Sequence, residues 1–480
     1  MYTTHGGTNL ITVDVLRELS RSIWFGVALF FLLGGIFQII TYIRGSRRSP
    51  VRTVYLPFIF FGFALFILAI SSGIIALHAG AFFEFSISRL AVLTLIGLSG
   101  TLFTVGALTI GGYREYYGVP IIIFLGLIIS VVYFPFISGY NIAILFLSLS
   151  LSLVAVPLFV FLYLAYVTKR FAPLAYGLAI FALFYSLIFY FIPIIPYLTE
   201  AAISMSAALL LSGSAFSRIR SKVSGITYSF AFLAILFVAS VFSAMSDILS
   251  FSTQTVILDW GTTGFLSLIV AGYLGGRYFE KPSKPTFYLA AFFYFMGILS
   301  LLSLLLEILP FLPLNIDTTF IIFLQNTSYL IAGAFLVLTA MTLIRNERLT
   351  SFLLVYLTFS ITVLYFLGGS PPGWLSTFIF VSVILLYGFP LIVFAILVMM
   401  YAGRGGIAYY RAVTLFIGTL FFVLSYFFGI LYVYSPWPVR LPVSGIYASI
   451  LPFILRLIAM ASFALGITGV SLRRLKMRKA

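Results

Sequence analysis

Residues 446–467 read IYASILPFILRLIAMASFALGI, an apolar run interrupted by a single charge at Arg456. A helix needs about 20 apolar residues to cross the hydrocarbon core of a bilayer, and this stretch provides them. Similar runs recur along the whole chain, without the alternation of apolar and polar residues that a membrane β-barrel strand requires. The sequence therefore predicts an all-α fold, a polytopic transmembrane helical bundle.

The composition of the chain agrees with this fold class. Of its 480 residues, 62% are hydrophobic and 8% are charged, whereas an ordinary soluble domain is about 25% charged. A soluble fold could not remove so much apolar surface from water. The composition excludes a soluble enzyme, a disordered chain and a nucleic-acid-binding domain. We expect a multi-pass protein of the cell membrane, in contact with membrane lipids and with no nucleic acid as a partner.

The length predicts the number of spans. If each span and its loop take about 30 residues, the chain holds roughly 15 spans. The predicted spans start near Ser22, Val54, Arg89, Val119, Ile142, Leu174, Leu198, Thr227, Val256, Thr286, Thr318, Ser351, Leu375, Ala412 and Ile446. The bundle then covers residues 22–472. An external N-terminal segment, 1–21, precedes it, and apolar residues on one side of this segment predict an amphipathic helix at the outer interface.

Lys and Arg are divided unevenly between successive loops, which predicts the orientation. One set of loops holds Arg44, Arg47, Arg48, Arg52, Arg114, Lys169, Arg170, Arg218, Arg220, Lys222, Arg277, Lys281, Lys284, Arg345, Arg348, Arg404, Arg411 and the basic tail, 473–480. The other set holds only Arg17, Arg21, Arg89 and Arg440. By the positive-inside rule the first set is cytoplasmic. The N-terminus is then outside and the C-terminus inside, which requires an odd number of spans.

One charge lies deep within a predicted span. Arg456 is about ten residues into the last span, near the bilayer midplane at about 1.5 Å per residue. An unpaired Arg at that depth costs at least about 2.5 kcal/mol, so we expect it to have a partner. Two roles remain open: a structural clamp to a neighbouring helix or to a carbonyl freed by Pro452, and a contact for an anionic substrate in a cavity.

The possible partners of Arg456 are polar residues of other predicted spans. They are Gln325 and Asn326 of the eleventh span, Ser240, Ser243 and Asp247 on one face of the eighth, Asp259 at the start of the ninth and Glu307 at the end of the tenth. The sequence does not choose among them. It places all three acids near outer ends of spans and none near the midplane. This placement counts against a proton pump or a cation-coupled transporter, which need acids within the bilayer.

Few residues of the chain can ligate a cofactor. There is no Cys, which excludes thiolate metal sites and cysteine nucleophiles, and there are two His. His5 lies in the polar N-terminal segment and His78 near the outer end of the second predicted span, so the two are not placed to face each other across a haem. We expect no cofactor bound by this chain alone and no catalytic centre of its own. His78 is a candidate external contact for a partner subunit or a quinol.

The predicted hairpins show no sequence identity to one another. An odd number of spans does not divide into two equal halves either, so we expect no simple inverted repeat of the transporter type.

A very hydrophobic, Cys-free chain rich in Ile, Tyr and Phe, with many spans, resembles the hydrophobic B subunit that accompanies a b558/566-type membrane cytochrome in thermoacidophilic archaea. The resemblance covers the character of the whole chain and implies no site residues. It implies a respiratory electron-transfer assembly, with haem or iron–sulfur centres on partner subunits and quinol as the electron source. We therefore predict a cofactor-free membrane subunit of a larger complex. The alternatives are a transporter or flippase for a hydrophobic or lipid-linked substrate, and an integral-membrane transferase.

Overall fold

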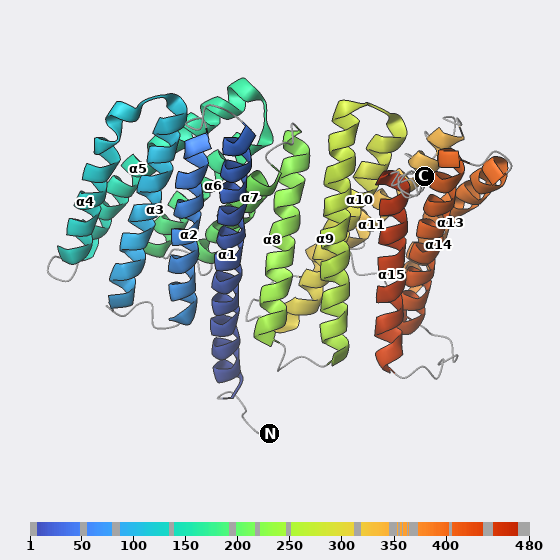
Figure 1. Cartoon of the computed structure of the whole chain (residues 1–480). Helices are drawn as coiled ribbons and strands as arrows, with labels where there is room; N and C mark the ends of the chain where they lie inside the picture. Colours follow the sequence, from blue (N-terminus) through green and yellow to red (C-terminus); the bar gives the residue numbers. More distant parts are fainter. Residues whose placement is uncertain are drawn as a thin grey trace. The chain divides into compact units, whose positions relative to one another are not determined.

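A computed structural model of the chain is built from long helices (Figure 1). The structure describes residues 7–48, 55–78, 87–133, 139–191, 198–216, 221–245, 251–311, 318–344, 353, 356–357, 359–361, 363, 373–402, 406–434 and 445–468. Within these ranges there are helices and short turns and no strand. Thirteen helices in the described part are long and apolar enough to cross a membrane. The prediction of an all-α, multi-pass membrane protein is confirmed.

Fourteen of the predicted spans correspond to the described α-helices in chain order. These are α1 (Gly7–Arg48), α2 (Leu56–Leu77), α3 (Ile87–Gly111), α4 (Gly118–Tyr133), α5 (Gly139–Thr168), α6 (Phe171–Phe191), α7 (Leu198–Ala215), α8 (Lys222–Met245), α9 (Phe251–Glu280), α10 (Lys284–Ile308), α11 (Thr318–Leu343), α13 (Gly373–Ala402), α14 (Gly406–Tyr434) and α15 (Gly445–Thr468). The span predicted from Ser351 falls where few residues are described, and those few are helical. His5, Asp247 and the basic tail lie outside the described residues.

The first predicted span and much of the segment before it form one helix. α1 runs for 42 residues from Gly7 to Arg48, so residues 7–21 continue directly into the first span. The location of this extension at the outer interface stays a prediction.

The chain divides into two compact units, residues 1–245 and 246–480. In the first unit, α1 packs on α2, α2 on α3, α3 on α5, α5 on α6, α6 on α7, and α7 returns to α1. These six helices therefore form a closed ring. α4 packs against α3 and α5, and α8 packs against α1, α6 and α7 (Figure 1).

The second unit has a ring of its own. α9 packs on α10, α10 on α11, α11 on α13, α13 on α14, α14 on α15, and α15 returns to α9. Large aromatic side chains dominate its core, and several are fully buried: Phe292, Phe293, Tyr387, Phe394, Phe422 and Phe463. Edge-to-face and stacked contacts join these rings, an arrangement that adds about 0.5–1.5 kcal/mol per pair beyond the buried area.

The outer surfaces of the helices suit a lipid environment. Large apolar side chains are exposed on them, for example Ile122 at 69% and Phe159 at 72%. Inside the bundle, many Ser and Thr hydroxyls donate to a carbonyl one turn earlier in their own helix, as Thr101 does to Gly97 and Thr419 to Leu415. This local bonding satisfies polar groups where no water is present.

The predicted orientation can be tested with single cysteines, because the chain has none of its own. His78 and Arg114 are both exposed at helix ends, and the charge pattern predicts that they lie on opposite sides of the membrane. A membrane-impermeant maleimide should label His78→Cys in intact cells, and should label Arg114→Cys only after permeabilisation. The reverse pattern would show that the orientation is inverted.

Candidate functional site

Arg456 lies in the middle of α15 and is buried, with 4% of its surface exposed. Pro452 interrupts the backbone bonding of α15 one turn earlier. Isolated burial of a guanidinium is unfavourable, so the surrounding residues must provide a counter-charge and hydrogen-bond acceptors.

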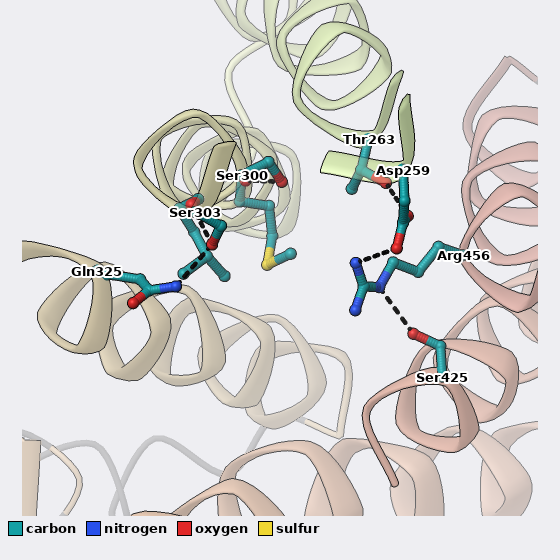
Figure 2. Close-up of polar contacts among 9 residues, drawn as sticks. Asp259, Thr263, Ser300, Ser303, Gln325, Ser425 and Arg456 are labelled. Carbon is teal, nitrogen blue, oxygen red and sulfur yellow. Dashed lines mark hydrogen bonds and ion pairs between the residues drawn. The ribbon is translucent and has the colours of Figure 1, made fainter. Parts of the chain in front are cut away.

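The counter-charge is Asp259 of α9 (Figure 2). The Arg456 Nη1 atom donates to Asp259 Oδ2 at 2.7 Å. Asp259 is buried as well, with 5% of its surface exposed. The sequence offered Asp259 as one possible partner among several, and the structure selects it.

The predicted start of the ninth helix is wrong. We expected the ninth span to start near Val256 and Asp259 to sit at its outer end. The helix instead begins at Phe251, so Asp259 lies roughly 12 Å inside it at about 1.5 Å per residue. An acid therefore does lie inside the bundle, level with the central residue of α15, and the argument against proton or cation transport from missing acids no longer holds.

Three further side chains contact the pair, and Figure 2 shows two of them, Ser425 and Thr263. Arg456 Nε donates to Ser425 Oγ of α14 at 3.0 Å. Thr263, one turn after Asp259 in α9, donates to Asp259 Oδ1 at 3.3 Å. The guanidinium carbon of Arg456 lies 4.0 Å from the centre of the Trp260 ring, a cation–π contact that is stronger when desolvated. The pair thus joins α9, α14 and α15 through charge-assisted bonds.

The other predicted partners on α10 and α11 are placed differently. The Gln325 amide donates to Ser303 Oγ of α10 at 2.7 Å, and in Figure 2 it points toward that hydroxyl. Asn326 is half-buried in α11. Glu307 is exposed at the penultimate position of α10, and its membership of an intramembrane polar site stays a prediction.

The predicted polar face of the eighth span is not a single buried surface. Ser240 is buried and donates to the Leu236 carbonyl of its own helix at 2.8 Å. Ser243 is exposed, and both belong to the first unit. Asp247, the third member of this face, lies outside the described residues.

His78 follows the last residue of α2 and is exposed. Its Nδ1 atom lies 2.9 Å from the Ile74 carbonyl oxygen and donates to it. The role of His78 as an external contact stays a prediction. In the part of the chain that the structure describes, no three His, Asp or Glu residues are grouped as metal ligands.

The first unit contains a buried polar cluster that was not predicted from the sequence. Gln38 of α1 donates through Nε2 to Tyr176 of α6 and to Ser214 of α7, the latter at 2.9 Å. The hydroxyls of Tyr176 and Ser214 lie 2.6 Å apart. A Gln inside an otherwise apolar span was a visible signal, and the cluster joins three helices of the ring.

Comparisons with known proteins identify no relative of this chain. No protein-family model, curated protein sequence or solved structure matches this chain. The interpretation of the site therefore depends on the contacts described above.

Breaking the ion pair on one side should destabilise the second unit strongly. Asp259→Asn leaves the Arg456 charge buried without a counter-charge, and we expect a loss of about 3–5 kcal/mol in the free energy of unfolding. The double variant Asp259→Leu with Arg456→Leu should lose much less, since an apolar replacement of a buried pair is often neutral. Chemical denaturation in detergent measures both.

Arg411→Leu is the matched control, because Arg411 is an exposed Arg on α14. Its effect should stay within about 0.5 kcal/mol. If Asp259→Asn costs no more than this control, Arg456 has another counter-charge and the pair is not the clamp.

Proposed function

We propose that this chain is a membrane-embedded subunit of a larger respiratory electron-transfer complex, in which partner subunits carry the haem or iron–sulfur centres. In this role the chain provides anchoring and docking surfaces and has no redox centre of its own. One observation carries the proposal. Arg456, the charge predicted to lie deepest in the membrane, is buried and bonds to Asp259 and Ser425.

A charge that serves a transport pathway needs access to water or to substrate. The side chains of Arg456 and Asp259 are only 5% and 7% exposed. Their charged atoms bond to each other, to Ser425 and to Thr263, all from the second unit. This geometry favours a clamp between helices over a contact for an anionic headgroup.

The composition supports a subunit whose redox centres are carried by partner subunits. The absence of Cys removes the usual ligands of iron–sulfur clusters, and the chain's two His include an exposed His78 at a helix end. Exposed basic residues at helix ends, among them Arg114, Lys169 and Lys281, give the predicted cytoplasmic side a positive surface. Such a surface steers and orients acidic partners.

Purification in a mild detergent tests the proposal. We expect stoichiometric co-purification of subunits that contain haem or iron–sulfur centres, detected by mass spectrometry and by the visible spectrum. A monodisperse, colourless single polypeptide would contradict the proposal and favour a transporter or flippase for a hydrophobic substrate.

The double variant Asp259→Leu with Arg456→Leu distinguishes these two functions further. If the pair is only a clamp, the folded double variant should keep its partner subunits. If the double variant assembles normally but lipid or substrate movement stops in reconstituted vesicles, Arg456 contacts the substrate and the clamp interpretation is wrong. Arg411→Leu again serves as the control.

A further inference from the structure

The two units of the chain share one plan. In each, the first helix packs on the second, the second on the third and the third on the fifth. The ring then closes through the sixth and seventh helices. The fourth helix of the first unit, α4, lies outside its ring, and the span predicted between α11 and α13 occupies the same place in the chain order. This order indicates a tandem duplication of seven helices, with α8 as the connection.

The sequence carries traces of the same duplication. Residues 125–134, LGLIISVVYF, correspond to 357–366, LTFSITVLYF. Residues 153–161, LVAVPLFVF, correspond to 386–394, LYGFPLIVF, and both contain the proline inside the helix. The repeat spans half the chain, so a comparison between hairpins does not detect it.

A shared packing contact fixes the register of the two copies. A Cβ atom on Gly100 of α3 would lie 3.7 Å from Leu153 Cβ of α5, and one on Gly333 of α11 would lie 2.9 Å from Leu386 Cβ of α13. Gly100 thus corresponds to Gly333, and Leu153 to Leu386. The same register pairs two further positions: Ile96 with Tyr329, and Val154 with Tyr387.

The first unit contains a pocket within its ring. The pocket has an empty volume of about 940 Å³, including the space at its open side, and helices α1 to α7 all contribute to its wall. Ile96 and Val154 line it.

The second unit has tyrosines at the corresponding positions. Tyr329 and Tyr387 are both buried, their rings are stacked with centres 5.1 Å apart, and the Tyr387 hydroxyl donates to the Tyr329 carbonyl at 3.0 Å. Two aromatic rings therefore occupy the positions at which the first unit has the smaller Ile96 and Val154. Among the described residues, the second unit therefore has the larger side chains at these two positions.

The wall of the open pocket selects for uncharged ligands. None of the described residues that line it is charged, and burial of a charge there would lack a counter-charge. Its polar side chains are hydroxyls: Ser71, Ser72, Ser99, Ser150, Ser186 and Thr199. Several of these donate to backbone carbonyls, as Ser71 does to Leu68 and Ser99 to Ala64. Their oxygens can still accept a hydrogen bond from a ligand hydroxyl.

We propose that the pocket of the first unit binds an uncharged, lipid-soluble molecule with an apolar body and a hydroxyl head. The apolar body would lie against the side chains of α3, α5 and α6, and the hydroxyl would bond to the serine oxygens. In the second unit, Tyr329 and Tyr387 stand at the positions of Ile96 and Val154, so the same ligand is not expected there.

Photolabelling of the purified full-length protein tests the proposal. The probe is a long-chain alcohol that carries a photoreactive diazirine, and labelled residues are located by peptide mass spectrometry. We expect labels on the pocket side of α3 and α5, and labelling that excess unlabelled alcohol removes. Val154→Tyr places at this position the residue that the second unit has at Tyr387. It should lower this labelling at least about tenfold, equivalent to about 1.4 kcal/mol of affinity.

Leu151→Tyr is the matched control, since Leu151 is on the same helix and 49% exposed; it should leave the labelling unchanged. If Val154→Tyr does not fold, Ile96→Tyr makes the same test from α3. A diazirine fatty acid of equal length should label the pocket less than the alcohol. The proposal is overturned if the tyrosine variants keep full labelling, if the acid labels equally, or if excess alcohol does not compete with labelling of the wild type.

Discussion

The structure depends on one constraint: inside a bilayer, a polar group must find its partner within the protein, because no water is present to bond with it. Many Ser and Thr hydroxyls of the described helices meet this requirement locally, as in the bond from Ser240 to the Leu236 carbonyl. Larger polar groups cannot do so and must reach another helix. Gln38 and Arg456 therefore mark places where helices are held together by specific contacts rather than by apolar packing alone.

The fold class could be predicted from the sequence because bilayer thickness converts an apolar run directly into a span. The partner of Arg456 could not, because it depends on which helices are neighbours. Asp259 and Trp260 together look like the end of a span, where an acid and an amphipathic aromatic ring are common. In the structure α9 begins earlier, at Phe251, and both side chains serve the buried guanidinium instead. Their neighbouring positions in the sequence thus have a structural reason that hydropathy does not show.

The duplication is difficult to recognise in the sequence for a related reason. Most positions of a membrane helix need only be apolar, so Leu, Ile, Val and Phe replace one another freely and identity disappears. What persists are residues with a geometric role: the prolines at 157 and 390 inside α5 and α13, and the glycines at 100 and 333 where two helices approach closely. The order in which the helices pack on one another reveals the repeat, because helix packing is more constrained than the identity of apolar side chains.

The two copies differ in how they meet the demand for close packing. The second unit buries stacked aromatic rings and an ion pair, contacts that stabilise it without any ligand. The first unit leaves space at the corresponding place, and an apolar cavity reduces stability because its lining loses packing contacts. A molecule that binds only the folded state restores part of this stability in proportion to its concentration. In the first unit the proposed ligand would thus supply contacts that the second unit makes with its own tyrosine rings.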